Sequence, residues 1–225
     1  MKHNKAIFSM AIISLLIGGC ATQSTTNDPS PIKEASEKNV LTVKSSLDVK
    51  DDFSNAKELF ETSQYVALVH IDEILESDNI NYYTNEKVAP YTIGKMTILE
   101  MYKGTLEKNR QVTFTKLGGT LPFTKYYEGL SEAQQAKIDE INPDAKESYE
   151  SVKYALNEDI DIEQGKNYLV YFVDDHYYLT EESYTLYGLQ GGLREVKNAN
   201  EQASKRKVLN NYKNEWELLD EVVLH

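Results

Sequence analysis

Hydrophobic and polar positions alternate over much of the chain after residue 65, and this alternation predicts a sheet. In YVALVHIDEIL, for example, Ala67, Val69 and Ile71 fall on one face of an extended segment. Turn residues separate the segments, and no helical pattern lies between the short strands near the C-terminal end. The pattern predicts strands over 65–75, 91–102, 111–117 and 168–173, with shorter ones in HYYLT, YTLYGLQ and LREV.

Apolar residues spaced by three and four predict helices elsewhere. DDFSNAKELFETSQ has this spacing before the first strand, which predicts an N-terminal helix. Ser131 and Gln134 form a capping-box pattern ahead of one further helical run, and Pro143 suits the first turn of the next. A two-helix insertion is therefore expected over about 120–159, between the third and fourth strands.

The end of the chain carries an apolar stripe that predicts a C-terminal helix packed on the sheet. A partner-binding surface is the alternative use of such a stripe. Together these elements predict an α+β domain over 51–225. The stripe consists of Leu209, Tyr212, Trp216, Leu219 and Val223.

The first residues have the pattern of an export signal. Lys2 and Lys5 precede an apolar run over 6–17, which is too short to span a bilayer comfortably. The run ends in Gly18-Gly19-Cys20, which resembles a bacterial lipobox. The resemblance implies a signal peptide over 1–19 and a diacylglyceryl group on Cys20. An uncleaved anchor helix and an ordinary signal peptide with a chance cysteine are the alternatives.

Residues 20–50 are polar and contain Pro29 and Pro31, which predicts a flexible tether. NVLTVKSSL within it has the character of a short strand. We expect a protein held by lipid on the extracytoplasmic face of the cell membrane, at a Gram-positive surface. Two acyl chains supply enough buried methylenes for stable anchoring.

The chain is acidic, with a formal net charge of −12 that becomes −14 when Lys2 and Lys5 leave with the signal peptide. Phosphates would be repelled, so nucleic acid is excluded as a partner. Electrostatic adhesion to anionic lipids is excluded for the same reason. Cys20 is the only cysteine, so the domain has no internal disulfide.

The order of elements, together with a set of short turn motifs, resembles small OB-like barrels of bacterial exported proteins and lipoproteins. More distantly, it is similar to the netrin-like domain of tissue inhibitors of metalloproteinases. The likeness covers about 53–119 and 160–197 and implies a small antiparallel, closed or nearly closed five-stranded barrel. The motifs are Tyr102-Lys103-Gly104, Gly118-Gly119, Gly165-Lys166-x-Tyr168-Leu169-x-x-Phe172 and Gln190-Gly191.

Protease inhibition does not follow from that resemblance. In the metalloproteinase inhibitors it depends on an N-terminal cysteine held by disulfides at the edge of the domain. Cys20 has no partner cysteine and lies a tether away from the predicted barrel. The insertion over 120–159 also departs from the compact family pattern.

No motif of a nucleophilic, zinc, nucleotide or dinucleotide site is present, so we expect neither an enzyme nor a cofactor. Asn157, Asp159 and Asp161 alternate in NEDIDIEQG, as oxygen ligands of calcium do. Ile162, however, stands where an EF-hand loop needs glycine. In a strand the same alternation would place these side chains on one solvated face, so calcium remains only an alternative.

Tyrosine is abundant, with 16 residues, and amphipathic rings suit recognition of proteins and sugars. Tyr126 and Tyr127, in LPFTKYYEGL, are expected in a binding loop, and Tyr82 and Tyr83 are further candidates. The sequence therefore predicts a non-enzymatic binding module for a protein, peptide or glycan. The alternatives are a hydrolase of wall polymers that uses paired carboxylates, and a signal peptide that resembles pheromone precursors.

Overall fold

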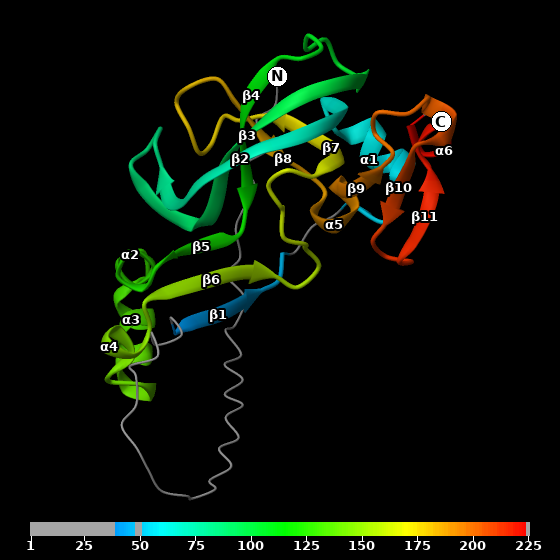
Figure 1. Cartoon of the computed structure of the whole chain (residues 1–225). Coiled ribbons are helices and arrows are strands. Elements are labelled where there is room, and N and C mark those ends of the chain that lie inside the picture. The colour runs from blue at the N-terminus through cyan, green and yellow to red at the C-terminus, as the bar shows by residue number, and fades with distance from the viewer. Residues whose placement is uncertain (1–38, 48–50, 224–225) are drawn as a thin grey trace, which may run out of the picture.

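The computed structural model describes residues 39–47 and 51–223, and shows a mixed α+β protein rich in strands (Figure 1). The expected signal peptide, Cys20 and most of the expected tether lie outside the described residues. The strands are β1 (Val40–Ser45), β2 (Tyr65–Asn81), β3 (Glu86–Lys103), β4 (Gln111–Leu117), β5 (Gly119–Pro122), β6 (Ser151–Leu156), β7 (Asn167–Asp174), β8 (Ser183–Leu186), β9 (Leu193–Lys197), β10 (Lys207–Asn210) and β11 (Glu215–Leu218).

The helices of the described residues are short, and none is long and apolar enough to cross a membrane. The expected N-terminal helix is confirmed as α1, where Asn55 caps the first turn by accepting hydrogen bonds from the backbone N–H groups of Lys57 and Glu58. The helices are α1 (Ala56–Thr62), α2 (Phe123–Glu128), α3 (Glu132–Ile141), α4 (Ala145–Ser148), α5 (Leu189–Gly192) and α6 (Leu219–Val223), with a 3-10 turn, η1 (Ala203–Lys205).

Five strands form a closed circuit of backbone pairing in the order β7-β2-β3-β4-β8, with β8 pairing back to β7. The outer edge of β7 is shared between two neighbours. Its first half pairs with β9 and its second half with β8. The expectation of a wholly antiparallel arrangement is wrong at one place, since β4 and β8 run parallel. Beyond β9 the sheet continues through β10 to β11.

Both faces are buried over the first half of β2, residues 66–71, which explains the nearly continuous apolar sequence there. Ala67, Val69 and Ile71 point into the circuit, where they belong to one core cluster with residues of β3, β4 and β7. Val66 and Leu68 belong to a second cluster with residues of α1, α6, β7 and β10. Figure 1 shows α1 and α6, which contribute to the second cluster, beside the strands β9, β10 and β11.

The Tyr102-Lys103-Gly104 motif fastens α1 to the sheet. The Lys103 ammonium donates hydrogen bonds to the carbonyls of Phe60 and Ser63 at 2.6 Å, at the C-terminal end of α1, where carbonyls lack helical partners. Gly104 has φ +94°, and a Cβ there would lie 2.4 Å from the Tyr65 ring. The motif is thus explained by helix capping and close packing.

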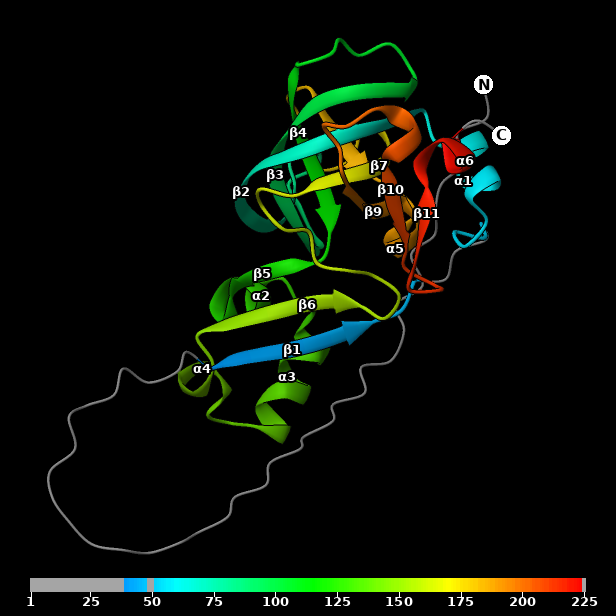
Figure 2. The ribbon, with the colours of Figure 1, turned by 45° about the vertical axis from the view of Figure 1, so that its right-hand side comes forward.

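A second, three-stranded sheet in the order β1-β6-β5 lies below the circuit, with α2, α3 and α4 packed at its far side and end (Figure 2). The strand expected in NVLTVKSSL is present as β1, parallel to β6. Leu41 and Val43 of β1 pack against a separate core cluster around Phe123 and Val152. The folded part therefore begins by Val40, inside the segment expected as a tether.

The expected C-terminal helix is wrong. β10 and β11 form a hairpin in which Leu209 and Trp216 are cross-strand partners, and only the short α6 follows. The turn between them has Asn214 at φ +54°, a conformation that asparagine tolerates. Cross-strand pairing across this turn brings together the apolar residues that the linear sequence spaces like a helix.

The two-helix insertion is confirmed for its first helix and wrong for its second. α3 begins at the expected capping box, with Ser131 and Gln134 bonded reciprocally. The second predicted helix is reduced to α4, after which Val152 and Leu156 belong to β6. The short strand expected in HYYLT is absent from the structure, where Asp175 instead accepts backbone hydrogen bonds from Tyr177 and Tyr178 at 2.8 Å.

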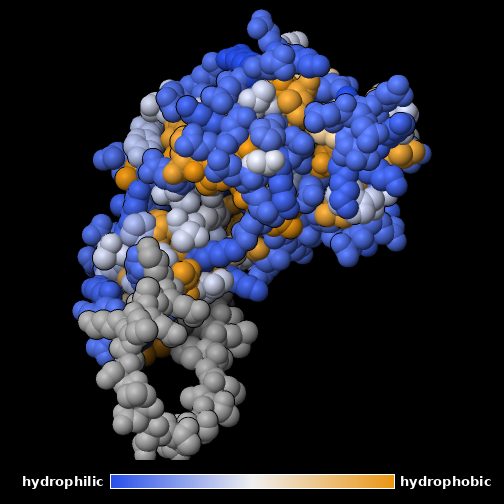
Figure 3. Space-filling view, viewed as in Figure 1, coloured by the Kyte–Doolittle hydropathy of each residue, from blue (hydrophilic) through white to orange (hydrophobic). Residues whose placement is uncertain are grey.

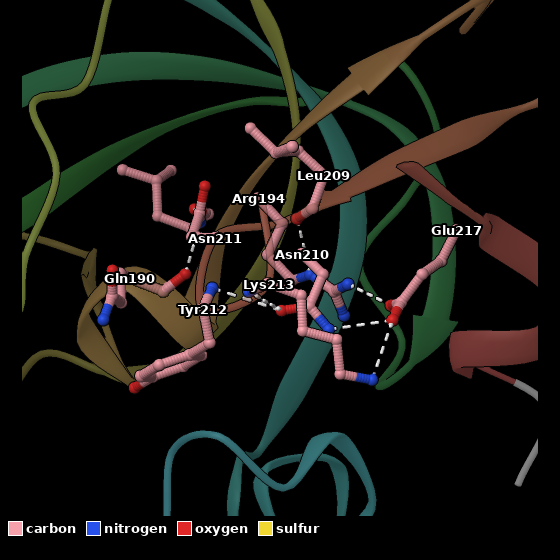
Figure 4. Close-up of polar contacts among 9 residues, drawn as sticks. Gln190, Arg194, Leu209, Asn210, Asn211, Tyr212, Lys213 and Glu217 are labelled. Atoms are coloured by element: carbon pink, nitrogen blue, oxygen red, sulfur yellow. Dashed lines mark hydrogen bonds and ion pairs between the residues drawn. The ribbon is translucent and has the colours of Figure 1, made fainter. Parts of the chain in front are cut away.

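A buried polar network ties the C-terminal hairpin to the main sheet (Figure 4). The Arg194 guanidinium donates to the Glu217 carboxylate at 2.6 Å and to the Leu209 carbonyl at 2.9 Å. Burial acts to raise the pKa of Glu217, but hydrogen bonds from Asn210 and Arg194 outweigh it and lower that pKa. Glu217 is therefore held ionised against Arg194, and the hairpin has a fixed register.

Candidate functional site

A cleft of about 360 Å³ lies where the small sheet meets the five-stranded circuit. β2, β3 and β4 form one side, β5 and β6 the other, and residues 159–162 close one end. The face of the molecule in Figure 3 is mostly hydrophilic, with hydrophobic residues scattered among the polar ones where the two parts meet. The polar side chains of the lining include Ser77, Thr92, Lys116, Thr120, Tyr154 and Asp159.

The inner wall of the cleft holds a buried ion pair between Lys116 at the end of β4 and Asp159. Their side chains are only 11% and 7% exposed. Asp159 uses Oδ2 in this pair, whereas its Oδ1 is buried and accepts no hydrogen bond from the described residues. Because an unsatisfied buried acceptor costs free energy, Oδ1 needs a donor, and a water molecule can supply one. Asp159 also lines a neighbouring cavity of about 20 Å³, which is large enough for one water.

A second lysine–aspartate pair stands at the mouth of the cleft. The Lys153 ammonium contacts the Asp161 carboxylate at 2.5 Å, and the side chains are 39% and 71% exposed. Lys153 is on β6 and Lys116 is on β4, so the two lysines come from opposite sides of the cleft. The cleft thus presents two neutralised charge pairs, one buried and one open to solvent.

Gly119 allows the strands to approach each other at the cleft. Its φ is +151°, and a Cβ there would lie 2.4 Å from Ser77 Oγ and 2.6 Å from Thr92 Oγ1. Thr92 donates to the Gly118 carbonyl at 2.8 Å, and Ser77 Oγ accepts from the Thr120 N–H at 3.2 Å. The Gly118-Gly119 turn therefore brings two hydroxyl groups into the lining.

The alternative calcium site does not assemble in the structure. Asn157 donates to Ser46 at 2.7 Å, while Asp159 and Asp161 each pair with a lysine. Within 39–47 and 51–223, no group of three or more histidine, cysteine or carboxylate side chains is placed to hold a metal ion. The alternating acids lie in an irregular segment between β6 and β7, so they share no strand face.

The expectation that Tyr126 and Tyr127 lie in a binding loop is wrong. Both are buried in α2, within the core of the small sheet. The Tyr127 hydroxyl donates to Asp139 at 2.6 Å, which ties α2 to α3. Their rings pack there with Leu121, Phe123 and Val152.

Tyr82 and Tyr83 are exposed as expected, with 48% and 50% of their surface accessible, at the tip of the β2–β3 hairpin. The Tyr82 N–H donates to the Tyr178 carbonyl at 2.9 Å, so the loop after β7 supports the hairpin tip. The Tyr82 hydroxyl donates to Asp78 at 2.8 Å. These two tyrosines lie outside the lining of the cleft.

Asp78 links the hairpin to the small sheet. Its buried carboxylate accepts from Tyr82 and pairs with Lys125 of α2 at 3.0 Å. Burial acts to raise the pKa of Asp78, but the hydrogen bonds from Tyr82 and Lys125 outweigh it, and the pKa falls below its ordinary value of 3.8. The same contact raises the pKa of Tyr82 to about 12.

Comparison with known proteins assigns no family, since the sequence matches no protein-family model and no curated protein significantly. The motifs behind the OB-like resemblance have structural roles here. Gly191 and Gly192 leave room for the backbones of Phe53 and Tyr187, which a Cβ would meet at 2.0 Å and 1.6 Å. The functional question therefore rests on the cleft and on the exposed tyrosines.

The two lysine–aspartate pairs give a matched test of burial. Replacing Lys116 by Met should lower the free energy of unfolding by roughly 3–5 kcal/mol, because it leaves the buried Asp159 without a partner. Replacing Lys153 by Met should cost less than about 1 kcal/mol, because that pair is exposed. Urea unfolding of both variants measures the difference. Equal losses would contradict the description of the cleft wall.

Asp78 should contribute to the acid limit of stability. Its folded-state pKa lies below the unfolded value, so its contribution is complete above pH 3.8 and is lost as the pH falls through the folded-state pKa. In Asp78→Asn, unfolding free energy should decline less steeply below about pH 4 than in the unmodified protein. Urea unfolding at a series of pH values measures this slope. Glu86→Gln, on the exposed hairpin, is the control and should leave the acid limb unchanged.

Proposed function

We propose that this protein is a lipid-anchored, extracytoplasmic, non-enzymatic binding module whose ligand site is the cleft. The observation that carries the proposal is the pairing of a buried, partly unsatisfied Asp159 with Lys116 inside a concave surface. Concave sites with a few convergent polar groups are the usual places for ligand binding. The cleft volume lies within the range of such sites, roughly 300–1,000 Å³.

The scaffold of this module is an OB-like barrel with an inserted subdomain. The closed pairing of five strands supports this, as does the position of β5, α2–α4 and β6 between the third and fourth strands of the circuit. Folds of this class are used for many unrelated functions, so the barrel does not indicate a ligand. The ligand is specified by the side chains at the junction of barrel and insertion.

The ion pairs of the acids in the cleft favour binding over wall-polymer hydrolysis. Two carboxylates of the cleft, Asp159 and Asp161, are each engaged by a lysine. Glycoside hydrolysis needs one carboxyl group held neutral as an acid next to a second that acts on the sugar or on water. Ion pairs that already engage both carboxylates suit a site that offers donors and acceptors side by side.

The membrane anchor is the lipobox-like cysteine, and it has a direct test. Cys20→Ala should abolish lipid attachment and release the protein from the membrane fraction, because no other cysteine can take the acyl chains. Fractionation with metabolic lipid labelling measures both effects. Undiminished membrane retention of Cys20→Ala would contradict the anchor.

Cross-linking on intact cells tests the cleft as the binding site. Lipidation occupies Cys20, so Thr120→Cys places the only free thiol at the exposed rim of the cleft, ready for a photoactivated cross-linker. We expect a reproducible adduct from this position. Ser204→Cys, on η1 away from the cleft, is the matched control and should give none. Identical adducts at both positions, or none at Thr120→Cys, would overturn the proposed site.

A further inference from the structure

The lining of the cleft favours one class of ligand. We infer that the cleft binds a neutral sugar unit, an inference that rests on the proposed function and specifies its ligand. The argument has three parts: the charge of the lining, the arrangement of its hydrogen-bonding groups, and its apolar surface.

The charge of the lining disfavours anions. Three acids and two lysines line the cleft, which gives a formal charge of −1. The whole chain adds a repulsive background, with a net charge of −12. Phosphates, carboxylates and sulfated polymers would have to displace Asp159 or Asp161 from a lysine in order to bind. A cation gains little, because Asp159 and Asp161 are already paired with lysines and Glu76 is exposed, where solvent screens its charge.

The hydrogen-bonding groups of the cleft match hydroxyl groups. A hydroxyl both donates and accepts, so it can donate to a carboxylate of the lining and also accept from the ammonium of Lys116, which has three N–H donors. The hydroxyls of Ser77 and Thr92 come from neighbouring strands and lie close to the Gly118-Gly119 turn. Neighbouring donors and acceptors, with the buried charges already paired, are what a polyhydroxylated ligand requires.

The rest of the lining is apolar and includes one aromatic ring. Ile74, Leu156, Ile160 and Ile162 contribute aliphatic surface, and Tyr154 contributes its ring. A sugar presents C–H groups on its ring faces and hydroxyls at its edges, so mixed walls of this kind cover both. At about 360 Å³ the cleft is near the lower limit for small-molecule sites, which favours a short ligand or a single unit of a polymer.

Matched sugars that differ only in charge test this inference. The full-length lipoprotein is prepared in phosphocholine micelles, which carry no sugar head group. Saturation-transfer NMR then compares glucose, galactose and N-acetylglucosamine with glucuronate, galacturonate, glucosamine and galactosamine. We expect signal from at least one neutral sugar, and at least tenfold weaker binding of the uronates and of the amino sugars.

Two variants assign the effect to the cleft. Glu76→Gln combined with Asp161→Asn changes the formal charge of the lining from −1 to +1 and leaves the buried pair intact. The preference for neutral sugars over uronates should fall at least tenfold in this double variant. Tyr83→Ser, on the exposed hairpin tip outside the cleft, is the control and should leave the preference unchanged.

The outcomes separate this inference from the proposed function. Binding of a neutral sugar, with a preference over uronates that depends on Glu76 and Asp161, supports both. Preference for a charged sugar, or no binding of any neutral sugar while Thr120→Cys still cross-links to a partner, overturns the sugar inference and leaves the binding module standing. If Thr120→Cys gives no adduct and no sugar binds, both are overturned.

Discussion

β7 pairs with three strands, and most of the architecture depends on this. One edge of β7 pairs with β2, and the other is divided between β9 and β8. The pairing with β8 closes the five-strand circuit, while the pairing with β9 starts the extension that carries the C-terminal hairpin. β2 is paired along both edges, with β7 and β3, and the two faces of its first half each contribute to a separate core. The insertion lies between β4 and β7 in the chain, and β4 forms part of the cleft, so the geometry of both depends on this closure.

Local signals in the sequence predicted the elements whose cause is local. The strand over 111–117 has the bounds of β4, and Ser131 begins α3, because alternation and capping act between near neighbours. The helix predicted at the end of the chain is wrong because apolar residues spaced by three, four and seven fit a helix and also fit paired strands. The asparagine-rich turn before Glu215 was the signal that distinguished them.

The sequence predicted only part of the candidate site. The acids of NEDIDIEQG identified a segment that lines the cleft, but their partners, Lys116 and Lys153, come from two different strands. Lys116 lies 43 residues before Asp159, and no local pattern predicts such a pair. Tyr126 and Tyr127 failed as candidates for a related reason: burial depends on the small sheet, whose first strand arrives from a segment expected to be a tether.

The position of β1 has a consequence for the order of folding. Val40 pairs with Ser151, so this strand is made 111 residues before its partner. Closing so long a loop carries an entropic cost that nearer contacts do not bear, and contacts of high sequence separation slow folding. As the chain is synthesised N-terminal end first, the strands β2, β3 and β4 of the five-stranded circuit are available to pair before β6 exists. The side of the cleft formed by β6 is therefore completed late, after β2, β3 and β4 have emerged.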